Sequence, residues 1–129
     1  MMPLPHEAEL NGLRVLVVED TLLIAELIVD QLEEMGCTVV GPVPRVERGL
    51  VLAVREPLDG ALLDINLAGE LCFPIAEALI QRGVPIAFLT GYGEPNLPVA
   101  YRQRPLLTKP FQLSDLIEIV RCHFMQNRH

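Results

Sequence analysis

The sequence is poor in basic residues: ten Lys and Arg stand against seventeen Asp and Glu, and the formal net charge is -7. Proteins that bind nucleic acid use clustered lysine and arginine side chains to neutralise phosphates. We therefore expect no direct contact with nucleic acid.

Cysteine is also scarce. Cys37, Cys72 and Cys122 lie far apart, lack the spacing of metal ligands and would leave one residue unpaired in any disulfide scheme. Three thiols in a reducing compartment are the simplest interpretation, and this favours a cytoplasmic protein.

Long uninterrupted hydrophobic runs are missing as well. The most apolar stretch, residues 22–29, is interrupted or flanked by Glu19, Asp20, Glu26 and Asp30, so we expect no membrane insertion. Residues 1–12 are acidic and contain proline, unlike a signal peptide.

Apolar residues are abundant, at half of the 129 residues, which suffices for the core of one domain without disulfides or a structural metal. We assign residues 1–12 to an N-terminal tail and residues 13–127 to this domain, and we expect no output domain.

Hydrophobic patterning predicts strands that alternate with helices. The expected strands are 13–18, 37–43, 58–63, 85–89 and 106–108, and the expected helices are 21–35, 45–55, 73–82 and 113–126. This alternation predicts a parallel sheet covered by helices on both faces. Gly91, Gly93, Pro95 and Pro98 crowd the place of a fourth helix, which we expect to be short or irregular.

Two helices show an apolar stripe that predicts their buried face. On the first helix the stripe consists of Ile24, Leu27, Ile28, Leu32 and Met35. On the last helix it consists of Leu113, Leu116, Ile117, Val120 and Phe124.

Polar side chains suited to chemistry come where the apolar strands end. These residues are Glu19 and Asp20, Asp64, Thr90, and Lys109 followed by Pro110. The carboxyl ends of parallel strands share one edge of the sheet, where ligands bind. Three carboxylates, a hydroxyl and an ammonium at one edge suit a divalent cation and a phosphoryl group.

Each of these residues also has an ordinary explanation. Glu19 and Asp20 are favourable charges before a helix, Thr90 suits a strand, and Lys109 could be a solvated charge. Asp64 could cap its strand. Their order and their shared position at strand ends favour the site.

The same residues carry a family resemblance. An acidic pair after an apolar strand, a lone Asp64, then Thr90 and Lys109-Pro110 resemble the receiver domain of two-component response regulators over roughly residues 13–125. Residues 88–92, Phe-Leu-Thr-Gly-Tyr, resemble its FATGY subfamily with Leu89 in place of the usual Ala. The resemblance implies a flavodoxin-like (βα)5 doubly wound fold with a five-stranded parallel sheet in the order 2-1-3-4-5.

The resemblance also implies roles at the site. Asp64 would accept a phosphoryl group, and Mg²⁺ would be bound by Asp20, by Asp64, by Glu19 partly through water, and by the backbone carbonyl of Asn66. Asn66 stands two positions after Asp64.

Thr90 and Lys109 would contact the phosphoryl group, with the Lys109-Pro110 bond in the cis form. Receivers commonly place a switching aromatic residue three positions before this lysine, where this chain has Leu106. The aromatic residue here is Tyr92, so we expect Thr90, Gly91 and the segment from Tyr92 to Tyr101 to reorganise on phosphorylation.

The predicted function is a stand-alone signalling switch, and not an enzyme. Its expected partners are a histidine kinase and possible phosphotransferase or downstream proteins, with docking at Leu22 and Leu23; the expected state is a monomer or weak dimer. One alternative is a small Mg²⁺-dependent phosphatase with an aspartyl-phosphate intermediate, which would need an acid where Asn66 stands. Another is a receiver-like binding module that is not phosphorylated.

Overall fold

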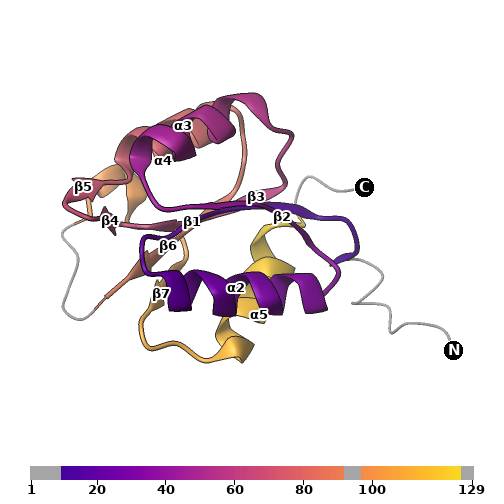
Figure 1. Cartoon of the computed structure of the whole chain (residues 1–129). Coiled ribbons are helices and arrows are strands. Elements are labelled where there is room, and N and C mark those ends of the chain that lie inside the picture. The colour runs from indigo at the N-terminus through magenta and orange to yellow at the C-terminus, as the bar shows by residue number, and fades with distance from the viewer. Residues whose placement is uncertain (1–9, 92–96, 126–129) are drawn as a thin grey trace, which may run out of the picture.

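The computed structural model describes residues 10–91 and 97–125 (Figure 1). Its main sheet has five parallel strands in the order β2-β1-β3-β6-β7, which confirms the predicted topology. The strands are β1 (Arg14–Val18), β2 (Thr38–Val43), β3 (Gly60–Asp64), β6 (Ile86–Thr90) and β7 (Leu106–Thr108).

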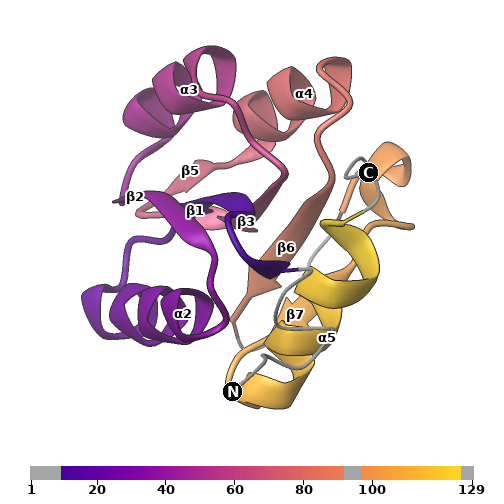
Figure 2. The same ribbon diagram turned by 90° about the vertical axis from the view of Figure 1, so that its right-hand side faces the viewer.

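Helices cover both faces of this sheet, as the alternating pattern predicts. Figures 1 and 2 show helices on each side of the sheet. They are α3 (Val46–Arg55) and α4 (Phe73–Gln81) on one face, and α2 (Leu22–Glu34) and α5 (Leu113–His123) on the other. None of the described helices has the length and apolar character that crossing a membrane requires.

The strand side chains divide the core into two clusters. In β1, Leu16 and Val18 belong to the cluster under α3 and α4, whereas Val15 and Val17 belong to the cluster under α2 and α5. All four are fully buried. Because successive side chains of a strand point to opposite faces, a strand that is apolar throughout can fill both clusters.

The stripes predicted on the two helices are partly wrong. Leu27 is 58% exposed and Leu113 is 43% exposed, although both were expected to face inward. On α2 the buried residues are Ala25, Ile28 and Leu32, and on α5 Ile119 is buried. Each helix has more apolar residues than its inner face can hold, so the periodicity alone could not choose which of them would stay outside.

A three-residue 3-10 helix, η1 (Val99–Tyr101), takes the place of the fourth helix, in agreement with the expectation of a short or irregular element. Tyr101 packs η1 against the core. Its ring stacks on Phe73 with centroids 5.2 Å apart and lies 5.7 Å from that of Phe88 in β6. Tyr92 lies outside the described residues.

Leu10 falls within the predicted N-terminal tail, but it is 1% exposed and belongs to the cluster under α2 and α5. Gly12 is also bound, because its N–H donates to the carbonyl of Gly36 at 2.8 Å. The chain therefore packs against the domain a few residues before β1.

Candidate functional site

Strands β1 and β3 bring three carboxylates to one edge of the sheet. The register pairs Val18 with Leu63, so Glu19 and Asp64 follow at the same level of neighbouring strands. Carboxylate oxygens of Glu19, Asp20 and Asp64 all lie within 4.8 Å of one another. Glu19 and Asp64 are buried, whereas Asp20 is exposed.

Strands β6 and β7 add the hydroxyl and the ammonium. Asp64 pairs with Leu89, which places Thr90 one residue beyond it, and Thr90 pairs with Thr108. The N–H of Lys109 donates to the carbonyl of Thr90 at 2.8 Å. The residues predicted at four strand ends therefore lie on one edge.

Lys109 connects two of the carboxylates. Its Nζ lies 2.6 Å from Oε1 of Glu19 and 3.1 Å from Oδ2 of Asp64. Burial works to lower the pKa of the ammonium, but its interactions with the carboxylates of Glu19 and Asp64 outweigh burial and raise the pKa above the usual value. The peptide bond from Lys109 to Pro110 is cis, as the resemblance implies.

The carboxyl group of Asp64 has a strongly shifted pKa. Burial and, next, the neighbouring Glu19 raise the pKa, Lys109 partly offsets them, and together they take it from 3.8 to about 7. Like charges in a buried site disfavour ionisation, so a bound cation would stabilise the carboxylate form.

Asp20 has the opposite shift. Partial burial works to raise its pKa, but hydrogen bonds with Asp64 and Glu19, and one from the N–H of Ala68 at 3.1 Å, hold the pKa below the usual value. The exposed Asp20 therefore ionises more easily than Asp64.

Ala68 belongs to a small hairpin that the sequence patterns did not predict, formed by β4 (Asn66–Leu67) and β5 (Glu70–Leu71). Its turn residues Ala68 and Gly69 both have positive φ, 54° and 95°, as a tight two-residue hairpin requires. Asn66 Oδ1 accepts a hydrogen bond from the N–H of Gly69 at 2.8 Å. Asn66 and Gly69, residue types that are common in and beside turns, were the available signal.

The donor set fits a divalent cation with a preference for oxygen. Mg²⁺ binds one or two carboxylates and keeps several waters, and three carboxylates are available here. Oε1 of Glu19 is buried and has no well-directed hydrogen bond among the described residues, its contact being the ion pair with Lys109. Such an oxygen could serve as a ligand or accept from a metal-bound water.

The cysteines contribute no reactive group to this edge, and none of the three forms a disulfide. Burial and the charge of Asp64 raise the pKa of the Cys72 thiol to about 12. A thiol with that pKa stays protonated and is a poor nucleophile.

Comparison with known proteins agrees with this geometry. Residues 15–121 match the family described as the response regulator receiver domain. SdrG from Sphingomonas melonis Fr1, known from a solution structure, is 38% identical; the match covers 83% of this chain and 92% of that one, with a TM-score of 0.76.

Two further relatives extend the comparison. A BeF3-activated conformation of SdrG from Pseudomonas melonis Fr1 is 37% identical, covers 83% of this chain and 92% of that one, and has a TM-score of 0.70. An uncharacterized transcriptional regulatory protein of Bacillus subtilis (strain 168), YbdJ, is 25% identical over 124 residues, which are 93% of this chain and 53% of the relative. The chain thus spans about half the length of that curated relative.

The family match covers most of the chain, and the five-stranded parallel sheet has the topology that the resemblance implies. The chain belongs to the family of response regulator receiver domains.

Proposed function

We propose that this chain is a phosphorylation switch in which Asp64 accepts a phosphoryl group from a histidine kinase with the help of Mg²⁺. The supporting observation is the convergence of three carboxylates and one ammonium at neighbouring strand ends. This combination places a nucleophile, ligands for a cation and a positive charge for the transferred group at one site.

In the proposed reaction, an oxygen of the Asp64 carboxylate forms a bond to phosphorus. The bond from phosphorus to the donor atom breaks, and its electron pair leaves with a nitrogen of the kinase histidine or an oxygen of acetyl phosphate. Oδ1 of Asp64 accepts from the N–H of Asn66 at 3.2 Å, and Oδ2 contacts Lys109. The carboxylate is therefore oriented by groups on both of its oxygens.

Asp20, Asp64, Glu19 and the backbone carbonyl of Asn66 are the proposed ligands of the metal. A bound Mg²⁺ would offset the negative charge that gathers as phosphoryl and carboxylate oxygens approach each other. Asp20 is suited to enter this ligand set first, because it is exposed and has a lowered pKa.

Thr90 and Lys109 are the proposed contacts of the phosphoryl oxygens. The Thr90 side chain lies at the buried end of β6, and Gly91 after it has no side chain to obstruct its backbone N–H. A Cβ added at Gly91 would meet no atom of the described residues within 4 Å, so this side of Gly91 is not obstructed by them. Movement of Thr90 and Gly91 toward Asp64 would change the conformation of the segment that follows. That segment begins with Tyr92, the last residue of the FATGY-like pattern.

The comparison with SdrG supports this assignment, because that relative has a BeF3-activated conformation and is 37% identical to this chain. Beryllofluoride has the tetrahedral geometry of a phosphoryl group. We expect it to bind beside Asp64 here as well.

A phosphatase reaction is less compatible with the hairpin. Such an enzyme would need an acid–base group two positions after Asp64, and Asn66 stands there. Its side-chain oxygen accepts from the N–H of Gly69 within the turn, so the amide acts as a structural group.

We define the docking surface as Leu22, Leu23 and Leu27 on α2, which are 70%, 73% and 58% exposed. Leu22 and Leu23 begin the helix directly after Glu19 and Asp20. Large apolar side chains at such exposure beside a reactive site favour contact with another protein. We propose that the kinase, or a phosphotransferase, docks there in a reducing cytoplasm.

The experiment uses the fact that Lys109 is the sole lysine of the chain. Protein labelled with ¹³C at lysine gives one set of side-chain signals, which report directly on the site. Beryllofluoride with Mg²⁺ should shift the Lys109 signals of the wild type and leave those of Asp64→Asn unchanged. Signals that stay unchanged in the wild type at saturating beryllofluoride and Mg²⁺ would refute the proposal.

A further inference from the structure

A hollow lies beside η1, away from the carboxylate cluster. It has a volume of about 630 Å³ and is lined by the end of α4, the start of β6, η1, the residues before β7 and the end of α5. Hollows of 300 to 1,000 Å³, roughly, are typical of small-molecule sites. This one therefore has the size of a ligand pocket.

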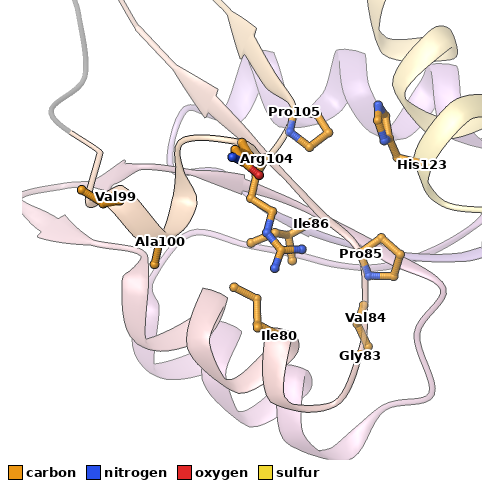
Figure 3. Close-up of a pocket in the computed structure, with 11 residues that line it drawn as sticks. Ile80, Gly83, Val84, Pro85, Ile86, Val99, Ala100, Arg104, Pro105 and His123 are labelled. Atoms are coloured by element: carbon orange, nitrogen blue, oxygen red, sulfur yellow. The ribbon is translucent and has the colours of Figure 1, made fainter.

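The lining of the hollow mixes apolar side chains with three polar ones, those of Gln103, Arg104 and His123. Ile86 and Val84 are buried, and Ile80, Pro85 and Pro105 add apolar surface. Figure 3 shows the side chain of Arg104 extending between Ile86 and Ile80.

The guanidinium of Arg104 makes no hydrogen bond or ion pair with any described residue, although the side chain is half-buried. Other arginines in the fold do have partners: Arg14 pairs with Glu56 at 2.9 Å, and Nε of Arg102 donates to the carbonyl of Leu97 at 2.9 Å. None of the described residues that line the hollow is acidic, in a chain of net charge -7. An anion would therefore meet an unpaired cation and no local repulsion.

On the side of the hollow formed by β6 and the residues before β7, the backbone offers few donors. Pro85 and Pro105 have no N–H, and the N–H groups of Gly83, Val84 and Arg104 donate to carbonyl groups of the chain. A phosphate site needs several such donors. A carboxylate needs only the two parallel hydrogen bonds that a guanidinium provides.

We propose that this hollow binds a small monocarboxylate with an apolar body, the carboxylate paired with Arg104 and the body lying on Ile80, Pro85 and Pro105. This site is separate from the carboxylate cluster and does not depend on the phosphoacceptor role of Asp64. Benzoate is a suitable probe, and benzamide has the same shape without the charge.

The test is a titration of the ¹⁵N-labelled full chain, followed by amide NMR. Benzoate should produce saturable shifts at residues around the hollow. Benzamide should bind at least about fivefold more weakly, because it lacks the charge-assisted pair. Arg104→Gln should reduce benzoate binding to the level of benzamide. Arg121→Gln, which removes an exposed charge outside the hollow, should leave it unchanged.

A second variant tests the apolar part of the site. Ala100→Phe adds a large ring from the η1 wall and should block both probes. Equal binding of benzoate and benzamide, or equal effects of Arg104→Gln and Arg121→Gln, would overturn the proposal, as would the absence of saturable shifts. Asp64→Asn should bind benzoate like the wild type, so this result is independent of the outcome at the carboxylate cluster.

Discussion

Nζ of Lys109 lies closer to Glu19 than to Asp64: the distances are 2.6 Å to Oε1 of Glu19 and 3.1 Å to Oδ2 of Asp64. The lysine thus bridges two carboxylates of neighbouring strands. Since a cation at the same carboxylates would be repelled by this ammonium, Lys109 has two opposing effects. We expect it to lower the affinity for Mg²⁺ and to attract the phosphoryl group.

These two effects can be separated with Lys109→Met. We expect this variant to bind Mg²⁺ about tenfold more tightly, equivalent to about 1.4 kcal/mol, because the competing charge is gone. We also expect slower phosphorylation by acetyl phosphate. Calorimetric titration with Mg²⁺ and a phosphorylation time course check the two parts, with Arg121→Met as a control for the loss of one distant charge. Weaker Mg²⁺ binding by Lys109→Met would show that the lysine supports the metal site.

The shifted pKa of Asp64 predicts how the stability of the metal-free protein depends on pH. Because the pKa is 3.8 in the unfolded chain and about 7 in the fold, the unfolded chain binds fewer protons between these values. Folding stability should therefore fall as pH rises from about 4 to about 7. The shift corresponds to about 4 kcal/mol at full burial, and solvent screening reduces it to about 2 kcal/mol.

Asp64→Asn removes the destabilising effect of the ionised carboxylate. In chelator at about pH 8 the variant should therefore unfold at a higher temperature than the wild type, and the two unfolding temperatures should converge near pH 4. Asp30→Asn, an exposed change on α2, should follow the wild type throughout. Thermal unfolding across the pH range checks this. A lower unfolding temperature for Asp64→Asn at every pH would mean that the charged carboxylate stabilises the fold.

The positions at strand ends could be predicted from the sequence because one physical rule sets them. An apolar run must end where the strand leaves the core, and parallel strands end at a common edge. The prediction that these strand-end residues lie together therefore did not depend on side-chain packing. The residues are Glu19, Asp64, Thr90 and Lys109.

The orientation of the helices and the hairpin could not be predicted in the same way. Leu27 and Ala25 compete for the inner face of α2, and the choice depends on how the helix packs on the sheet. The contact from Ala68 to Asp20 joins residues 48 positions apart and depends on a backbone turn that no periodic pattern reveals. The hollow beside Arg104 likewise depends on how five elements meet.

The docking surface predicts a selective kinetic defect. Leu22→Ser combined with Leu23→Ser should slow phosphotransfer from the cognate kinase by about tenfold or more, because exposed apolar anchors often dominate an interface. Phosphorylation by acetyl phosphate, which needs no docking, should be unchanged. Val54→Ser, another exposed apolar position, on α3, serves as the control. Equal slowing with both donors would contradict the docking role.

Hydrogen exchange tests the route of the switch. With beryllofluoride and Mg²⁺, we expect the largest change in protection from Gly91 to Tyr101, since η1 is a single short turn that follows Thr90, the residue proposed to move. Amides of α5 should change little. A change confined to the surroundings of Leu106, with none in the segment ending at Tyr101, would show that the switch follows the position occupied by the aromatic residue in other receivers.

The most direct test of the central claim is the mass of the intact protein after incubation with acetyl phosphate. We predict the addition of one phosphoryl group in Mg²⁺ and none in chelator, with borohydride reduction and peptide mapping placing it on Asp64. Asp64→Asn should remain unmodified, and Asp20→Asn should need more Mg²⁺ to reach the same extent. Phosphate on Asp64→Asn at the wild-type level, or modification of the wild type that is independent of Mg²⁺, would contradict the account.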